Sequence, residues 1–299
     1  AVYRRTLVLS TSARLLCGYI YVSSGSGEST QDLVYSGHCI IAENGTSLAE
    51  NKPFEEKELT VTEIDVKKLA YERHKNTSFE PVTDVTFVKF NQEIRKTEIT
   101  RPIDKAPFVP SDKAALSSRA EAILRIQSYG LKKRLEHTRA KTAVIGVSGG
   151  LDSTLALLVA VRAMKLLNRP LSDICAVTMP GFGTTKRTHS NSDTLCSLLG
   201  VTFKEVNITA AVEQHFKDIG QDPACLDVTY ENSQARERTQ VLMDIANKSG
   251  GMVIGTGDLS ELALGWATYN GDHMSMYAVN SSVPKTLVRY LVRYEAECA

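Results

Sequence analysis

The chain has 299 residues, of which 42% are hydrophobic and 23% charged, and its formal net charge is +1. This composition is typical of a globular protein, and the length suggests about two domains. A charge so close to zero argues against extended binding to nucleic acid or to a membrane surface. No apolar run reaches membrane length. We therefore expect a cytoplasmic protein, with no nucleic-acid or membrane partner, that acts on small molecules.

The cysteines and histidines give no sign of a disulfide framework or a zinc centre. The six cysteines are widely spaced without a Cys-x-x-Cys pair, and the six histidines show no paired metal-ligand spacing. Cys17 lies in an apolar run that predicts a strand, and we expect it to have a structural role.

The first 90 residues are predicted to be rich in β-structure. Alternating or β-branched runs predict three strands, at Leu15–Val22, Asp32–Ala42 and Glu58–Ile64. Asn44-Gly45 is a strong signal for a hairpin turn. A short helix is predicted at Lys67–His74. Residues 91–112 are polar and contain three prolines, so we place an interdomain linker there.

From about Ser111 the pattern changes to helices that alternate with strands, beginning with a helix through Leu131. Strands are then predicted at Thr142–Val147, Ile174–Met179, Thr202–Ile208 and Met252–Ile254. Helices are predicted at Thr154–Leu167, His189–Leu199, Ala210–Ile219 and Tyr230–Lys248, with a final helical region after the last strand. Such alternation implies parallel strands joined by right-handed crossovers. We therefore predict an α/β fold with a doubly wound parallel sheet over residues 113–299.

The stretch Ser148-Gly149-Gly150-Leu151-Asp152-Ser153 follows the first of these strands and opens a helix. Adjacent glycines let backbone N–H groups crowd around an anion, and the helix start adds unpaired donors and the positive end of its dipole. Asp152 adds a hard oxygen ligand for the magnesium that accompanies nucleotide phosphates. The loop is therefore predicted to bind ATP. It lacks the Gly-x-x-x-x-Gly-Lys-Ser/Thr spacing of kinases and GTPases, and the alternative is a plain turn between strand and helix.

Two other polar clusters follow predicted strands, Pro180–Thr184 and Gly255–Glu261. Doubly wound sheets bind ligands beyond the carboxyl ends of their strands, so we expect both clusters to converge on the glycine loop. Asp152 and Glu261 would then face one pocket as magnesium ligands, and Thr256 could donate its hydroxyl to the nucleotide. The alternative for the acidic residues of the second cluster is a helix N-terminus, where the dipole favours them.

Three further groups of residues are candidates for ligand contacts. Asn232 and Arg236 share one face of a predicted helix, where an amide and a guanidinium suit a phosphate or carboxylate, and the alternative is a solvated charged face. Trp266 and Tyr269 could stack on an aromatic ring, and the alternative for the tryptophan is core packing. Lys285 could bind a ligand phosphate or be merely solvated.

Four motifs together resemble the glutamine-dependent NAD synthetase family. They are Gly146–Ser153, Asn232–Arg238, Gly255–Trp266 and Val283–Thr286. The glycine loop alone is shared by the N-type ATP pyrophosphatases, whereas the four motifs together are far more specific. The resemblance extends from about Ser111 to the end of the chain and implies a Rossmann-like sheet of the adenine nucleotide hydrolase type. Residues 1–90 resemble, more loosely, the later part of the family's nitrilase-like glutaminase domain, an α/β sandwich.

The resemblance implies a ligase that makes NAD in two steps. The nicotinate carboxylate of deamido-NAD attacks the α-phosphate of ATP, with Mg²⁺, and ammonia then displaces AMP from the acyl adenylate. By this match the ATP-binding residues are Gly146, Val147, Ser148, Gly149, Gly150, Leu151, Asp152, Ser153 and Thr256. Those for deamido-NAD are Asn232, Arg236, Glu261, Trp266, Ala267, Thr268, Tyr269 and Lys285. Asp152 and Glu261 would hold the metal, and no side chain of this chain need act as a nucleophile.

In this family ammonia comes from glutamine through a Cys nucleophile with Glu and Lys partners, all upstream of the part that aligns with Ala1. We therefore expect the chain as given to lack these groups and to depend on free ammonia. Cys17 does not align with the family's cysteine. We also expect a C-terminal part of the synthetase domain to be missing. A partial sandwich exposes apolar surface, so a homo-oligomer is expected.

Two other functions stay open. One is a tRNA-modifying ATP pyrophosphatase that adenylates a base, although the near-neutral charge and the lack of a paired catalytic cysteine argue against it. The other is a non-catalytic nucleotide-binding fragment.

Overall fold

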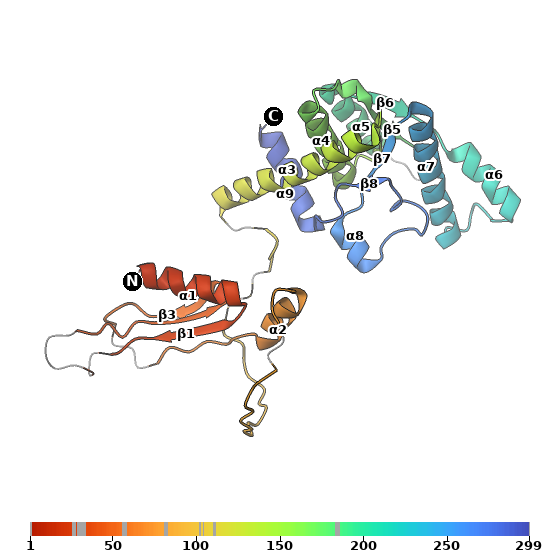
Figure 1. Ribbon diagram of the computed structural model, residues 1–299. Helices are drawn as coiled ribbons and strands as arrows, with labels where there is room; N and C mark the ends of the chain where they lie inside the picture. The colour runs from red at the N-terminus through yellow and green to blue at the C-terminus, as the bar shows by residue number, and fades with distance from the viewer. Residues whose placement is uncertain are drawn as a thin grey trace. The chain divides into compact units, whose positions relative to one another are not determined.

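The computed structural model describes residues 2–25, 28, 34–55, 59–80, 83–101, 103, 105–109, 112–182 and 186–298, apart from the side chains of residues 113 and 186–190. The chain divides into two compact units, Ala1–Asp104 and Lys105–Ala299, each taken by itself below (Figure 1). Within the described ranges, no helix combines the length and the apolar character needed to cross a membrane.

The first unit is a small antiparallel sheet with a helix packed on it. The strands are β1 (Gly18–Val22), β2 (Cys39–Glu43) and β3 (Thr46–Glu50), in the order β1-β2-β3. Helix α1 (Val2–Leu15) lies along the sheet (Figure 1), and its Val8 is buried against Ile40 and Ala42 of β2. Helix α2 (Val66–Lys75) confirms the short helix predicted at this place.

The hairpin predicted at Asn44-Gly45 is confirmed. Both residues have positive φ angles, 45° and 83°, and they join β2 to β3. The strand predicted at Glu58–Ile64 is wrong for its described part, residues 59–64, which forms no strand. The tight turn makes the segment directly after it, β3, the partner of β2, and the later apolar run is left outside the sheet.

The sequence pattern does not predict helix α1, and this helix changes the environment of Cys17. The strand predicted over Leu15–Val22 begins only with β1, and Cys17 lies in the turn between helix and strand. Residues 2–15 include several β-branched and hydroxyl side chains of modest helix propensity, so the local pattern understates this helix. Burial of Val8 and Ser12, one turn apart on one face, supplies the tertiary contact that stabilises it.

The second unit is built on a five-stranded sheet in which the neighbouring strands are parallel. The strands are β4 (Ala143–Gly146), β5 (Ile174–Thr178), β6 (Thr202–Glu205), β7 (Met252–Gly255) and β8 (Tyr277–Ala278). Their order is β6-β5-β4-β7-β8, which confirms the predicted doubly wound sheet. Because β5 and β6 lie on one side of β4 and β7 and β8 on the other, the strand order reverses at β4. Such sheets bind ligands in the crevice at this point.

Helices cover both faces of this sheet. They are α3 (Lys113–Thr138), α4 (Leu151–Leu166), α5 (Lys186–Leu199), α6 (Thr209–Ile219), α7 (Val228–Ser249), α8 (Leu259–Leu264) and α9 (Lys285–Cys298), with a 3₁₀ turn at Leu171–Asp173. Successive residues of β4 face opposite sides. Ala143 and Ile145 belong to the core formed with α3, α4 and α9, whereas Val144 packs with Leu242 and Ala246 of α7.

The predicted elements of this unit agree with the structure to within about three residues at most ends. The final region is the exception, because it comprises two helices, α8 and α9, with β8 between them. Strand β8 has only two residues, which is too short to produce an alternating pattern.

Candidate active site

The glycine loop joins β4 to α4 and is tied into one shape by its own hydroxyl groups. The backbone N–H of Ser148 donates to Ser153 Oγ at 3.3 Å, and Ser153 Oγ donates to the carbonyl of Gly150 at 3.0 Å. Gly149 has a φ of 77°, which favours glycine. No described side chain caps the start of α4 at Gly150, so its first N–H groups are open to an anion.

Three carboxylates from distant parts of the sequence meet beside this loop. Asp152 is in the first turn of α4, Asp258 precedes α8 and Glu261 lies in its first turn, and one oxygen of each lies within 4.8 Å of the others. We call these three residues the carboxylate cluster. The structure brings together Asp152 and Glu261, which the sequence analysis paired, and adds Asp258 as a third oxygen donor.

Asp258 and Glu261 also cap helix α8, which confirms the helix N-terminus that was the alternative for this acidic segment. Asp258 Oδ1 accepts from the backbone N–H of Glu261 at 3.0 Å, and Glu261 Oε2 accepts from that of Asp258 at 3.2 Å. Their other oxygens, Asp258 Oδ2 and Glu261 Oε1, point to the cluster. The capping box therefore fixes the orientation of two of the three carboxylates.

Lys285, at the start of α9, places its ammonium among the three carboxylates. Its Nζ lies 2.7 Å from Asp152 Oδ2, 3.0 Å from Asp258 Oδ2 and 3.3 Å from Glu261 Oε1. Burial opposes the charged form of Lys285, but hydrogen bonds to Asp152 and Asp258 outweigh it and raise the pKa of the ammonium. One ammonium offsets only one of three negative charges, so a further cation could neutralise the rest.

The pKa of the Asp258 carboxyl is lowered in spite of its burial. Asp258 is fully buried, which alone would raise its pKa, but the backbone N–H of Glu261 and the ammonium of Lys285 lower the pKa of its carboxyl. Asp152 Oδ1 is buried and has no hydrogen-bond partner among the described residues. Carboxylate oxygens are hard ligands of the kind that Mg²⁺ prefers, and an unpartnered buried oxygen such as Asp152 Oδ1 is costly unless a ligand satisfies it.

A buried amide, Asn280, connects the two chain segments that carry these carboxylates. Its Nδ2 donates to the backbone carbonyls of Asp152, at 2.9 Å, and Thr256, at 3.0 Å. The sequence pattern does not indicate this residue, because β8, the strand before it, has only two residues. A polar residue after a strand at the carboxyl edge of the sheet is the signal that would have found it.

The polar face of α7 holds the segment that follows α8. Asn232 Oδ1 accepts from Thr268 Oγ1 at 2.8 Å, and Arg236 Nε donates to the carbonyl of Tyr269 at 3.2 Å. Trp266 and Tyr269 are 79% and 83% exposed, so the alternative of core packing for the tryptophan is wrong. Both rings are available to a ligand or a partner.

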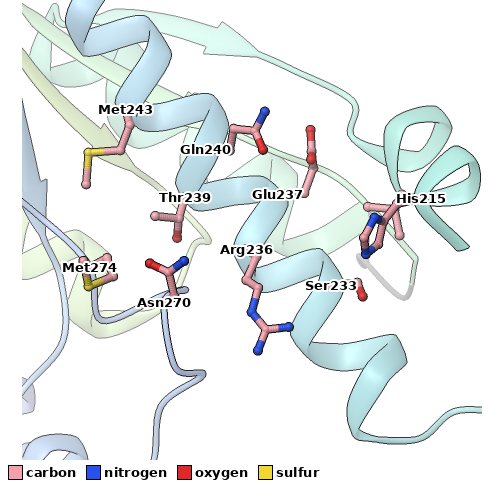
Figure 2. Close-up of a pocket in the computed structure, with 10 residues that line it drawn as sticks. His215, Ser233, Arg236, Glu237, Thr239, Gln240, Met243, Asn270 and Met274 are labelled. Atoms are coloured by element: carbon pink, nitrogen blue, oxygen red, sulfur yellow. The ribbon is translucent and has the colours of Figure 1, made fainter. Parts of the chain in front are cut away.

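A cavity of about 450 Å³ lies beside α7, and we call it the α7 cavity (Figure 2). Arg236, Glu237 and Gln240 line it from α7, His215 faces it from α6, and Asn270 lies across from Arg236. The described lining residues include no member of the carboxylate cluster. The described lining residues include Arg236 but not Lys285.

The cluster predicted after β5, Pro180–Thr184, is described only in part. Gly183 and Thr184 lie outside the described residues. Phe182 packs with α6 and α7, its ring centroid 6.2 Å from that of Phe216 and 5.7 Å from that of Tyr230. The described contacts of Phe182 are therefore those of packing.

The family comparison agrees with this geometry. The family model described as NAD synthase matches residues 123–297, more than half of the chain. The chain belongs to the NAD synthase family. A glutamine-dependent NAD(+) synthetase of Mycobacterium leprae (strain TN) is 44% identical over 308 residues, which cover 97% of this chain and 45% of that protein. The chain thus spans about half the length of this relative, and the family predicted from the four motifs is confirmed.

Two solved structures support the fold. Glutamine-dependent NAD+ synthetase from Acinetobacter baumannii, in complex with ADP, has a TM-score of 0.57 and 24% identity, and the match covers 100% of this chain and 48% of that one. NH3-dependent NAD synthetase from Campylobacter jejuni subsp. jejuni NCTC 11168, in complex with the nitrate ion, has a TM-score of 0.52 and 26% identity, over 59% of this chain and 73% of that one. The structural comparison and the sequence comparison thus both match the second unit to NAD synthetases.

Proposed function

We propose that this chain carries the part of an ATP-dependent ligase that amidates deamido-NAD to NAD, with ammonia as the nitrogen donor. In the whole protein that ammonia would be released from glutamine, as the names of its relatives indicate. The observation that carries the proposal is the meeting of Asp152, Asp258 and Glu261 beside a phosphate-binding glycine loop in a member of the NAD synthase family.

In this proposal the glycine loop, Gly146 to Ser153, and Thr256 bind the triphosphate of ATP. Open N–H groups at the start of α4 suit the phosphates. Asp152 and Glu261, joined by Asp258, would hold Mg²⁺, and the clustered carboxylate oxygens and the unpartnered buried Asp152 Oδ1 fit that ion. A bound Mg²⁺ would supply neutralisation of charge on the phosphates.

Deamido-NAD would lie between this loop and the segment held by α7. Asn232 and the stretch Trp266 to Tyr269 would bind it, with the two exposed rings stacking on its aromatic groups. Arg236 and Lys285 would contact its phosphates, and Glu261 would serve both ligand and metal. Because Arg236 contacts the carbonyl of Tyr269 and Lys285 contacts the carboxylate cluster, the two cations would bind different phosphates of the dinucleotide.

The chemistry asks this chain for positioning rather than for a nucleophile. A carboxylate oxygen of the nicotinate attacks the α-phosphorus of ATP, the bond from that phosphorus to the β-phosphate oxygen breaks, and pyrophosphate leaves. Ammonia then attacks the carbonyl carbon of the acyl adenylate, the carbon–oxygen bond to AMP breaks, and one proton is lost to solvent. Binding residues contribute by aligning the carboxylate with phosphorus and by offsetting charge on the leaving group.

The test is a turnover assay on the whole chain. With ATP, Mg²⁺, deamido-NAD and ammonium, we expect AMP and NAD to form in equal amounts. AMP that forms only when tRNA is added would favour a tRNA-modifying pyrophosphatase instead. Nucleotide binding without any AMP would favour a non-catalytic module. Either of these two results would overturn the proposal.

We also propose that copies of the chain associate into a homo-oligomer. The large apolar side chains of Leu264, Trp266 and Tyr269 are each at least 79% exposed beside the proposed site, which is unusual for a monomer surface. Sedimentation velocity on the purified chain tests this, and a monodisperse monomer at micromolar concentration would contradict it.

A further inference from the structure

We propose that Asn280 is a positioning residue that sets the distance between the two halves of the carboxylate cluster. One half is Asp152 on α4, and the other is Asp258 and Glu261 around α8. The proposal rests on the ATP and metal function proposed above, because its consequence is a change in metal affinity.

The strands that lead to the two halves are paired only at their start. In the register between β4 and β7, Ala143 lies opposite Met252 and Val144 opposite Val253, and the pairing then ends. Both strands continue for two more residues, to Gly146 and Gly255, before their loops begin. Sheet hydrogen bonds therefore do not fix the separation of the loops that carry the carboxylates.

Asn280 supplies the missing connection with two hydrogen bonds. Its Nδ2 donates to the carbonyl of Asp152 at 2.9 Å and to that of Thr256 at 3.0 Å, which uses both hydrogens of the amide. Asp152 itself carries one carboxylate, and Thr256 lies two residues before Asp258. One side chain, fully buried, thus joins the backbone on both sides of the cluster.

The direction of the Asn280 amide is fixed by a second buried amide. Gln127 Nε2, on α3, donates to Asn280 Oδ1 at 3.1 Å and to the carbonyl of Val279 at 2.9 Å. Because Gln127 occupies the oxygen end of Asn280, the nitrogen end must face Asp152 and Thr256. Both amides are buried, at 0% and 7% exposure, so water does not compete for these bonds.

Replacing Asn280 should loosen the cluster without removing any of its oxygens. In Asn280→Ala the carbonyls of Asp152 and Thr256 lose their shared donor, and the two loops are free to separate. Groups that orient metal ligands typically contribute 10-fold to 100-fold in metal affinity. We therefore expect Mn²⁺ to bind Asn280→Ala at least about tenfold more weakly than the wild-type chain in the presence of a non-hydrolysable ATP analogue.

The experiment is a Mn²⁺ titration of the whole chain, followed by electron paramagnetic resonance, with the analogue at saturation. Gln127→Met, which removes only the group that orients Asn280, should show a smaller loss in the same direction. Ile174→Val is the matched control, because Ile174 is fully buried at the start of β5, at the opposite end of the strands. It should lower the melting temperature and leave the Mn²⁺ affinity within about twofold.

Three outcomes would overturn the inference. Mn²⁺ affinity of Asn280→Ala within about twofold of wild type would reduce Asn280 to a packing role. If Asn280→Ala does not fold, an unchanged affinity in Gln127→Met would have the same meaning. If the wild-type chain itself binds no Mn²⁺ with the analogue, the proposed function fails, and the positioning role fails with it. If the wild-type chain binds Mn²⁺ and the variants bind it equally well, only the positioning role fails.

Discussion

The carboxylate cluster and the α7 cavity belong to the same unit but hold their side chains in different ways. Asp152, Asp258 and Glu261 are fixed by a capping box, a central ammonium and a buried amide bridge. The cavity is lined instead by side chains such as Arg236, which is exposed and makes one hydrogen bond through its guanidinium among the described contacts. The cluster is therefore prepared for a small hard ion, whereas the cavity can adapt to a larger ligand.

The largest expected effect is at the centre of the cluster. Asp152→Asn keeps the shape of the side chain but removes one charge, so we expect the rate of AMP formation to fall by about a thousandfold, as a loss of several kcal/mol in charge stabilisation implies. Asp173→Asn, in a partly exposed ion pair with Arg169 at the far end of the strands, is the control. Equal rates for Asp152→Asn and wild type would remove the cluster from the mechanism.

Asp258→Asn separates the two roles of its side chain. Asparagine is as good an N-cap as aspartate, so we expect helix α8 to persist. We expect Mn²⁺ affinity to fall about thirtyfold, since one of three charged ligands becomes neutral. Isothermal titration with a non-hydrolysable ATP analogue measures it, and a loss of less than threefold would confine Asp258 to capping.

Asp258→Asn should also change how the stability of the chain depends on pH. The pKa of Asp258 is lowered in the folded chain, so its ionised form stabilises the fold above the carboxyl's usual pKa, and this stabilisation is lost as pH falls through the lowered value. We therefore expect the wild-type chain to lose more stability than Asp258→Asn on acidification below about pH 4. Urea unfolding at several pH values tests this, and parallel curves would contradict it.

Lys285→Met tests whether the ammonium competes with the metal. Removal of a cation that contacts all three carboxylates should strengthen Mn²⁺ binding in the absence of nucleotide, by about tenfold, because nearby like charges oppose each other by a few kcal/mol at most near a surface. Lys165→Met, on the same helix as Asp152 but at its other end, is the control. Weaker Mn²⁺ binding in Lys285→Met would show that the lysine supports the ion.

The smallest effects are expected for Arg236, which lines the α7 cavity, and for the exposed Trp266. Arg236→Ala should raise the KM for deamido-NAD by about tenfold, as the loss of one charged hydrogen bond implies, and leave Mn²⁺ affinity within twofold. Trp266→Ala should raise the same KM by about fivefold through lost stacking, without a change in melting temperature, since the ring is exposed. An unchanged KM in both variants would place the ligand elsewhere.

The sequence predicts much of the second unit because its signals are local or follow from topology. Regular alternation places the strands, and the rule for carboxyl ends then predicts that Asp152 and Glu261 meet across more than a hundred positions. The rule does not predict a role for Asn280, because the strand before it has only two residues. It also does not predict that Lys285 lies among the carboxylates.

The first unit shows the opposite case. Asn44-Gly45 predicts its hairpin, since the turn demands two positive φ angles in succession. Helix α1 escapes notice because its residues have modest helix propensity and its stability comes from Val8 against β2. The misplaced third strand has the same origin, because pairing is decided by the turn and not by the apolar content of residues 59–64.

The most direct test of the central claim is a crystal structure of the chain with Mn²⁺ and a non-hydrolysable ATP analogue, with the metal located by its anomalous scattering. We predict one Mn²⁺ peak within coordination distance of oxygens from both Asp152 and Glu261, with the triphosphate against the glycine loop. A metal–nucleotide complex bound elsewhere, with Lys285 still in contact with all three carboxylates, would contradict the account.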